Sequence, residues 1–364
     1  MNIHELRRNK LRQLIRRAKL DALLVTNFTN VTYLTGFSGD DSYLLVSSDN
    51  QLLLSDPRYT IQLEEECPGL NRFTRDPGES MPDAVIKSVT AAKIERLGVE
   101  SGSMTLLEDR KLANGAPDVQ RVPIDDLVEQ LRLVKDRTEI DDTRLACRQA
   151  ERAFNAVRSL LTPEMTELEI AAELEYQARR FGARALSFPA IVAVGARSAL
   201  PHATPTQRKI GTANFSLIDW GAHTGRYMSD LTRVLVIGRI SPKLRKTYDV
   251  VLNAQLAAID LICPGVTCEA IDSVARTVIR KAGFDKAFGH GLGHGLGLEI
   301  HEGPRLSQNQ KLELRPGMIV TVEPGIYLPG WGGVRIEDDV LVTRGGHEVL
   351  SDLPKQLDDC ILCL

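Results

Sequence analysis

The chain has 364 residues, so the roughly 150 residues of a typical domain predict about two domains. Hydrophobic residues make up 43% and charged residues 26%, which is enough apolar material for full cores and excludes collagen-like, coiled-coil and wholly disordered chains. Lysine and arginine total 45 against 48 acidic residues, and this net charge of -3 excludes a global field that attracts nucleic acid or an anionic membrane.

The first twenty residues are rich in arginine and predict an amphipathic surface helix. Leu11, Leu14 and Ile15 fall at helical spacing, and the basic side chains are expected on the opposite side. An organellar transit peptide or a basic binding helix is the alternative, whereas the lack of a continuous apolar stretch argues against a secretory signal. The basic residues are Arg7, Arg8, Arg12, Arg16 and Arg17.

The cysteines and the hydropathy pattern favour a cytoplasmic protein. The six cysteines are few for this length and lie mostly within apolar segments, which is typical of reduced thiols in a cytosol. They are Cys67, Cys147, Cys263, Cys268, Cys360 and Cys363. Because no stretch of about 18 uninterrupted apolar residues occurs, we expect no membrane span.

The N-terminal third alternates short strand-like runs with turn residues. The runs lie at 22–25, 43–47 and 51–55, and helical stretches follow near Thr60 and Pro82. This pattern predicts an α/β domain.

A charged run over residues 131–137 precedes a long helical pattern from Glu139 to about Leu161. This change of character is the best candidate for a domain boundary, which we place near residue 132. The expected domains are therefore 1–132 and 133–364.

The C-terminal part carries a faint internal repeat. Three pairs of residues share the same offset of 101 positions: Pro163 and Pro264, Thr166 and Thr267, and Gly182 and Gly283. In each copy a proline turn precedes an N-cap threonine, and a glycine closes the second helix. In the first copy Thr166 and Glu169 form a capping box. The sequence thus predicts two half-domains of α-α-β-β order.

An acidic hairpin is predicted in the first half-domain. Apolar runs flank Thr224-Gly225, and a two-residue turn there places Asp219 directly opposite Asp230 on one face of the sheet. Opposed like charges destabilise a sheet, and more so between apolar strands, unless a cation neutralises them. A bound metal ion is the simplest neutraliser.

The second half-domain repeats this arrangement. An apolar run that ends at Glu323 leads through a turn centred on Gly330 to Glu337, so these two glutamates are expected to be approximately opposed. Either carboxylate alone would more often be a surface group or pair with a neighbour such as Arg335. Two acidic pairs, one in each half-domain, favour a shared metal site.

A glycine-rich segment over residues 289–304 carries three of the seven histidines. Glycine at every second position clears one face for the close approach of backbone or ligand, while His290 and His294 lie on the other face. The glycine spacing does not fit a dinucleotide-binding loop, and His301 lacks the second histidine of a zinc-peptidase helix. Because the segment precedes Glu323, its histidines are candidate ligands.

Together these motifs resemble the pita-bread metallopeptidases, and within them the Xaa-Pro branch of aminopeptidase P and prolidase. The likeness rests on Asp-x-Gly-Ala, Ser-Asp-x-Thr-Arg, Gly-His-Gly-x-Gly-Leu-Glu-x-His-Glu, Glu-Pro-Gly-Ile-Tyr and Gly-Val-Arg-Ile-Glu-Asp. Residues 34–39 and 56–59 resemble the creatinase-type N-terminal domain of that branch. The resemblance implies an α/β creatinase-like N-terminal domain followed by an α+β pita-bread catalytic domain.

The same resemblance implies a site for two divalent metal ions. Its ligands are Asp219, Asp230, His294, Glu323 and Glu337. Asp219, Asp230 and Glu337 are implied to span or complete both ions. Four carboxylates and one imidazole form a hard, oxygen-rich set, so we expect manganese, with cobalt, zinc and iron as alternatives.

The expected reaction is attack on the scissile carbonyl by a water that the two ions activate as hydroxide. Glu323 is the expected proton acceptor and could return the proton to the leaving nitrogen. The resemblance implies that His202 and His301 line the substrate pocket, where they could hold the substrate backbone or the developing oxyanion. His290 is left open between pocket lining and structural support, and Arg335 is expected to orient the glutamate two residues after it.

Two hypotheses from different classes follow. The first is an exopeptidase that hydrolyses Xaa-Pro bonds at peptide N-termini or in dipeptides, so that its substrates carry proline at the second position. The alternative is a catalytically silent pita-bread module that binds peptide or protein partners. The five ligands favour the enzyme, and the resemblance implies a homodimer. No nucleic-acid or membrane partner is expected.

Overall fold

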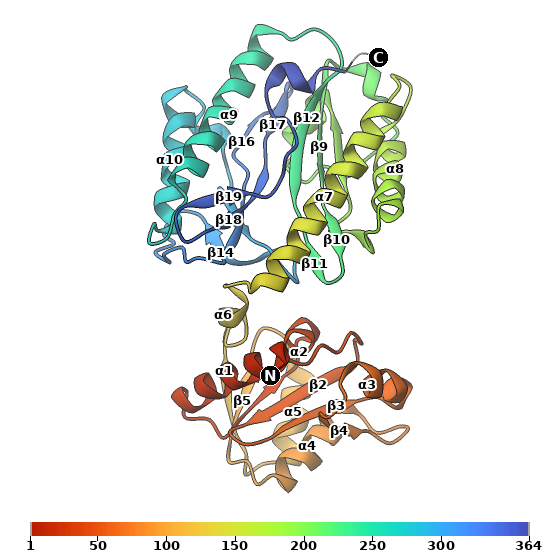
Figure 1. Ribbon diagram of the computed structural model, residues 1–364, viewed down its shortest axis with the longest axis vertical. Helices are drawn as coiled ribbons and strands as arrows, with labels where there is room; N and C mark the ends of the chain where they lie inside the picture. The colour runs from red at the N-terminus through yellow and green to blue at the C-terminus, as the bar shows by residue number, and fades with distance from the viewer. Residues whose placement is uncertain (1, 363–364) are drawn as a thin grey trace. The chain divides into compact units, whose positions relative to one another are not determined.

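The computed structural model describes residues 2–362, and the chain divides into two units, Met1–Leu131 and Arg132–Leu364 (Figure 1). The short helix α6 (Glu129–Arg132) contains the point of division. Cys363 lies outside the described residues, and the other five cysteines are free thiols. Within residues 2–362 no helix has the length and apolar character needed to cross a membrane.

The N-terminal unit is built on a mixed six-stranded sheet in the order β4-β3-β2-β1-β5-β6. Its strands are β1 (Ala22–Val25), β2 (Ser42–Ser47), β3 (Gln51–Ser55), β4 (Asn71–Thr74), β5 (Arg96–Glu100) and β6 (Gln120–Ile124). Its helices are α1 (Ile3–Arg17), α2 (Phe28–Thr35), α3 (Thr60–Glu66), α4 (Met81–Ala91) and α5 (Leu106–Gly115). Every residue of β1 is buried, so both faces of the sheet are covered. The α/β pattern predicted from the sequence is confirmed.

Helix α1 is the predicted helix, but its basic residues do not all lie on the solvent side. Arg7 and Arg8 are buried beside the expected apolar residues. Their Nη1 atoms donate to the carbonyl oxygens of Tyr33 and Leu34 at 3.1 and 2.7 Å. Carbonyls in the last turn of a helix lack helical partners, so the end of α2 attracts these two cations. The expectation of a wholly basic outer face was therefore wrong.

The C-terminal unit contains two helix pairs with strands between them (Figure 1). The helices are α7 (Arg137–Leu160), α8 (Glu167–Arg180), α9 (Pro242–Leu261) and α10 (Cys268–Lys281). The strands of the first half are β7 (Ala185–Leu186), β8 (Ile191–Val194), β9 (Phe215–Trp220), β10 (Ala222–Thr224), β11 (Tyr227–Met228) and β12 (Leu231–Val236). Those of the second half are β13 (Gly293–Gly295), β14 (Glu302–Leu306), β15 (Ile319–Val322), β16 (Gly325–Leu328), β17 (Gly332–Arg335), β18 (Asp338–Val342) and β19 (His347–Val349).

Alternate residues of β9 belong to two different cores. Ile218 and Trp220 pack with α7 and α8, whereas Leu217 packs with α9 and α10. Trp220 stacks on Phe154 of α7 with ring centroids 4.3 Å apart. Because side chains of a strand alternate between faces, the sheet β12-β9-β8 is buried on both sides. This explains its continuous apolar runs.

The internal repeat is confirmed. Thr166 and Thr267 are the N-caps of α8 and α10, and each also forms an isolated β-bridge, to Lys209 and Glu313 respectively. The glycines that follow the second helices, Gly182 and Gly283, have φ angles of +101° and +86°. The two halves therefore have the same helix caps, β-bridges and glycine turns at equivalent positions.

We expect Thr166→Ala to lower the free energy of unfolding by about 1 kcal/mol, because the Ala side chain cannot cap the helix. The Thr166 hydroxyl accepts from Glu169 N at 3.2 Å, and Glu169 Oε2 accepts from Thr166 N at 2.8 Å. Urea titration of metal-free protein measures the change. Thr138→Ala is the control, since Thr138 is exposed within α7, and it should be neutral or slightly stabilising. Equal effects of the two variants would contradict the capping role.

Candidate metal centre

One cavity in the C-terminal unit brings together all nine residues that the sequence singled out. Its volume is about 800 Å³. The nine residues are His202, Asp219, Asp230, His290, His294, His301, Glu323, Arg335 and Glu337. They come from both halves of the unit.

The first acidic hairpin differs from its prediction in register. Its turn is Gly225-Arg226, one residue later than expected, so Asp219 faces Thr232 and not Asp230. Gly225 has a φ of +58°, and glycine at the first central position is typical of a two-residue type II′ turn. Asp230 lies two residues before Thr232 and is therefore diagonal to Asp219 on the same face. Direct opposition was wrong, but the two carboxylates share a face.

The second acidic hairpin has the predicted register. Val322 of β15 faces Asp338 of β18, and the pairing of β16 with β17 continues the same register. Glu323 and Glu337 thus lie opposite each other, in the short gap between these two strand pairs. The turn is centred on Gly330, whose φ is +79°.

The glycine-rich segment allows the close backbone approach that was expected. A Cβ atom at Gly293 would lie 2.1 Å from Thr321 O, and one at Gly295 would lie 1.9 Å from Gly303 O. Both distances exclude any side chain. Strand β13 can therefore enter the sheet between β14 and β15 and hold His294 near the carboxylates.

Three of the implied ligands form a compact group. Asp230, His294 and Glu337 each offer one ligand atom, and these atoms lie within 4.8 Å of one another. His294 Nε2 is 3.6 Å from Asp230 Oδ2 and 3.5 Å from Glu323 Oε1. Asp219 is held beside the group by Arg335, whose Nη2 lies 2.5 Å from Asp219 Oδ2.

The hydrogen bonds of His294 make its Nε2 atom an acceptor. Nδ1 lies 3.0 Å from the carbonyl oxygen of Gly295, which can only accept, so Nδ1 carries the ring hydrogen. Burial lowers the pKa of His294 to about 4, which keeps the ring neutral. A lone pair of Nε2 therefore faces the oxygens of Asp230 and Glu323. This tautomer is typical of a metal-binding histidine.

Burial raises the pKa of all four carboxyl groups, that of Glu323 to about 8. Neighbouring carboxylates add to this effect at Asp230 and Glu337. In addition, Asp219 Oδ1 is buried and accepts no hydrogen bond from the described residues. Crowded carboxylates, an orphaned oxygen and an acceptor imidazole fit divalent cations, which favour oxygen and imidazole ligands.

Three residues that the sequence did not single out hold the candidate ligands in place. Thr232 Oγ1 donates to Glu337 Oε2 at 2.6 Å, and Thr321 Oγ1 donates to Glu323 Oε1 at 3.3 Å. Asp339 Oδ2 accepts from the backbone nitrogen of Asp230 at 3.0 Å. Their positions in the sequence could have indicated all three residues, because each is two residues away from a candidate ligand.

Arg335 makes its direct ion pair with Asp219, whereas the sequence led us to expect that it orients Glu337. Besides its ion pair with Asp219, its Nε donates to Thr232 Oγ1 at 3.1 Å and its Nη1 to Tyr327 Oη at 2.9 Å. Its hydrogen-bond path to Glu337 runs through Thr232, and its charge also opposes the rise in the pKa of Glu337 that burial causes. The guanidinium extends across the sheet toward β9, so spacing along its own strand did not reveal the partner.

The histidines of the cavity have different surroundings. His290 Nδ1 lies 2.7 Å from Gly291 O, and its Nε2 lies 3.0 Å from Tyr327 Oη, so the ring both lines the cavity and has fixed partners. His301 packs edge-to-face on His294 with ring centroids 4.4 Å apart. Burial lowers the pKa of His301. The position of His290 is compatible with both pocket lining and structural support, and its role stays a prediction.

Buried ion pairs anchor the segment that carries His301. Glu302 Oε1 lies 2.7 Å from Lys135 Nζ, and Glu302 Oε2 lies 2.5 Å from Arg132 Nη2. The side chains of Lys135 and Arg132 are 1% and 2% exposed. Burial alone raises the pKa of Glu302, but the two cations outweigh burial and lower it. The charged run at the boundary thus supplies counter-charges to Glu302, the residue next to His301.

Comparison with known proteins gives consistent matches over both units. Residues 141–344 match metallopeptidase family M24, and residues 7–134 match the creatinase/prolidase N-terminal domain. An Xaa-Pro dipeptidase from Pyrococcus horikoshii is 34% identical over 98% of this chain and 100% of its own length.

Solved structures agree with these matches. An Xaa-Pro dipeptidase from Bacillus anthracis shares 38% identity and a TM-score of 0.93, over 97% of this chain and 99% of that chain. An X-Pro aminopeptidase from Thermotoga maritima MSB8 shares 38% identity and a TM-score of 0.85, over 95% and 99%. The expected fold class, a creatinase-like α/β domain followed by an α+β pita-bread domain, is confirmed.

Proposed function

The chain belongs to metallopeptidase family M24, and from that premise we propose that it is an exopeptidase that hydrolyses Xaa-Pro bonds. The observation that carries the proposal is the group of four carboxylates, three buried and one half-buried, and one acceptor imidazole around a single cavity. The names of the similar proteins supply the substrate class. Peptides and dipeptides with proline at the second position are the proposed substrates.

Two divalent ions are the proposed cofactors, with manganese as the expected metal and cobalt, zinc and iron as alternatives. Asp219, Asp230 and Glu337 would hold both ions, and His294 and Glu323 would complete the set. When bound, such ions polarise a carbonyl group and lower the pKa of water toward neutrality.

The protein's own residues supply proton transfer and orientation. Glu323 is the proposed proton acceptor, and its pKa, raised to about 8 by burial, suits a group that takes up a proton near neutral pH and returns it to the leaving nitrogen. His301 stays neutral and can donate a hydrogen bond. His202 lines the same cavity, and the two histidines are proposed to hold the peptide backbone and the developing oxyanion.

An apolar part of the cavity is the proposed proline pocket. Phe188, Ile191 and Pro205 line it. A pyrrolidine ring offers only apolar surface to such a wall, and the bond before proline has no N–H that the enzyme must recognise.

We also propose a domain boundary near residue 132, a homodimer and a cytoplasmic location.

The experiment that tests the proposal starts with chelator-stripped protein. An Xaa-Pro dipeptide and an Xaa-Pro-Xaa tripeptide are assayed before and after Mn²⁺ is added. We expect cleavage before proline only with metal, and the ratio of the two rates gives the preferred length. Protein that binds these peptides but never cleaves them at saturating manganese would be the silent pita-bread module. Protein that does neither would overturn both hypotheses.

A further inference from the structure

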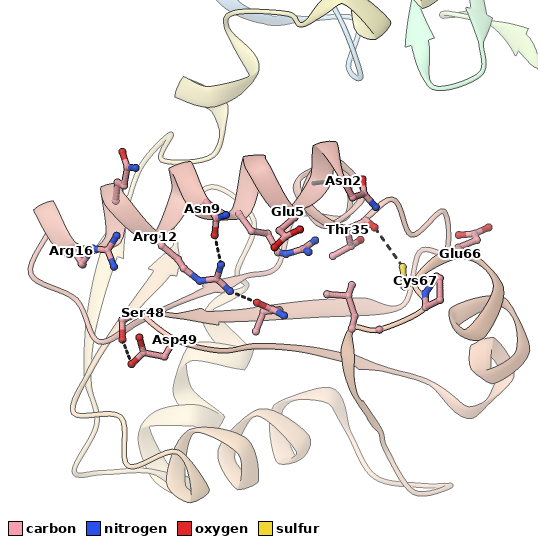
Figure 2. A pocket seen from close by; sticks show the side chains of 16 residues that line it. Asn2, Glu5, Asn9, Arg12, Arg16, Thr35, Ser48, Asp49, Glu66 and Cys67 are labelled. Atoms are coloured by element: carbon pink, nitrogen blue, oxygen red, sulfur yellow. Dashed lines mark hydrogen bonds between the residues drawn. The ribbon is translucent and has the colours of Figure 1, made fainter.

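A second cavity, of about 630 Å³, lies within the N-terminal unit (Figure 2). Helix α1 lines it together with the turn between β2 and β3 and the segment that follows α3. The proposed peptidase reaction uses none of these residues.

Three arginines of α1 line this cavity. Arg8, Arg12 and Arg16 are four residues apart, which places them on one side of the helix. None of them forms a salt bridge with any residue in the part of the chain that the structure describes. Like charges at this spacing repel each other, so the cluster is costly without a counter-charge.

Arg8 carries the least solvated of these charges. The residue is only 8% exposed. Its Nη1 is bonded to Leu34 O, but its Nε is buried and has no hydrogen-bond partner among residues 2–362. Burial, and then the charge of Arg12, lowers the pKa of Arg8, and the opposing charge of Glu5 does not cancel this shift. An acceptor atom in the cavity would remove the cost of this unpaired donor.

Arg12 is held by neutral acceptors only. Its Nε donates to Ser47 O at 3.2 Å and its Nη1 to Asn9 Oδ1 at 2.7 Å, and Nη2 contacts Gln51 Oε1. Each terminal nitrogen has a second N–H group that remains for another acceptor. Figure 2 shows Arg12 and Arg16 extending from α1 on the side of the β2–β3 turn. The guanidinium of Arg12 is thus positioned but not neutralised.

The acidic residues that line the cavity offset the charge of Arg8 only in part: the charge of Glu5 raises the pKa of Arg8, but burial and Arg12 outweigh it. Glu5, Asp49 and Glu66 are all exposed. Asp49 Oδ2 accepts from Ser48 Oγ at 2.9 Å, and Glu66 Oε2 accepts from Ser38 N at 2.7 Å. These carboxylates lie at the exposed side of the cavity, whereas Arg8 is shielded from solvent.

From this arrangement we infer that the cavity binds a small oxyanion with two or more negative charges through Arg8, Arg12 and Arg16. Guanidinium groups bind phosphate and carboxylate oxygens through paired N–H donors, and both kinds of ligand share this chemistry. The cavity volume of about 630 Å³ lies within the range of about 300–1,000 Å³ that is usual for small-molecule sites.

Isothermal titration calorimetry on the full chain tests the inference. The protein is stripped of metal, because the probes chelate divalent ions, and is titrated with pyrophosphate and, separately, with citrate. We expect saturable binding of one anion per chain to at least one probe, and the tighter probe distinguishes a phosphate from a polycarboxylate ligand. Arg12→Gln should weaken binding by about tenfold or more, since it removes a charged, paired donor.

Arg17→Gln is the matched control, because Arg17 is an exposed residue of the same helix that does not line the cavity. It should change the affinity by less than about twofold, as expected for a solvent-screened charge. Arg16→Gln is a second test that spares the buried part of α1, and it should also weaken binding. Equal losses in Arg12→Gln and Arg17→Gln, or no saturable binding of either probe, would overturn the inference. Neither result depends on peptidase activity.

Discussion

Asp230→Asn is expected to lower manganese-dependent cleavage of an Xaa-Pro substrate by more than about 100-fold. Loss of a residue that only supports a metal ligand costs up to about 100-fold, and loss of a direct ligand should cost more. Asp230 belongs to the compact ligand group, and its Oδ2 atom lies 3.6 Å from His294 Nε2. Asparagine has a similar shape but no charge, so it is a poor replacement for a carboxylate that would bind two ions.

The same variant should raise the thermal stability of metal-free protein. Burial and the nearby charges of Glu337 and Asp219 raise the pKa of Asp230, which means that its ionised form is unfavourable in the fold. Removing this charge relieves the repulsion. Stabilisation by added manganese should shrink in return, because at a given concentration a ligand that binds more weakly stabilises the fold less.

Activity, bound metal and the unfolding temperature are measured together for this variant. Asp249→Asn is the control, because Asp249 is an exposed carboxylate on α9, and it should leave all three unchanged. If Asp230→Asn kept its metal and its activity, the proposed ligand set would be wrong. A lower unfolding temperature without metal would contradict the repulsion argument alone.

Arg233→Ala is expected to destabilise the protein by about 3 kcal/mol, the lower end for breaking a buried ion pair, because Asp338 keeps its second cation, Lys355, at 2.6 Å. Arg233 is 1% exposed, and its Nη2 lies 2.7 Å from Asp338 Oδ1. It also donates to the carbonyl oxygens of Glu337 at 2.6 Å and Leu353 at 2.9 Å. The substitution therefore removes a counter-charge and the support of a candidate ligand at once.

Urea titration of metal-free protein measures this loss, with Arg245→Ala as the control. Arg245 pairs with Asp358 at 3.2 Å on the surface, and its loss should cost less than about 1 kcal/mol. Comparable losses of unfolding free energy in the two variants would show that the buried Arg233 ion pair stabilises the protein no more than a surface pair does.

The difference between wild type and Arg233→Ala should narrow in acid. Burial raises the pKa of Asp338, but Arg233 and Lys355 outweigh burial and lower it. A carboxyl whose pKa is lowered on folding stabilises the protein above its unfolded pKa of about 3.9, and this stabilisation is lost as the pH falls through the folded pKa. A difference that stayed constant down to the folded pKa would contradict this linkage.

The sequence by itself determined the local elements of this protein and the residues that meet in its cavity. Capping signals such as Thr166 with Glu169 involve contacts only three residues apart, and the turn at Gly330 correctly set the register of Glu323 against Glu337. The first hairpin offered two adjacent turn positions that both contained Gly225. Local residues did not distinguish them, and the register was predicted wrongly.

Only the tertiary structure decided which charges pair. Arg335 binds Asp219 across 116 positions of the sequence, and Lys135 binds Glu302 across 167. Neither ion pair follows from strand or helix periodicity, because each depends on how elements far apart in the sequence pack together. The burial of Arg8 against the end of α2 has the same origin. Periodicity predicts which face of an element a side chain occupies, whereas the partner on that face is fixed only when the elements come together.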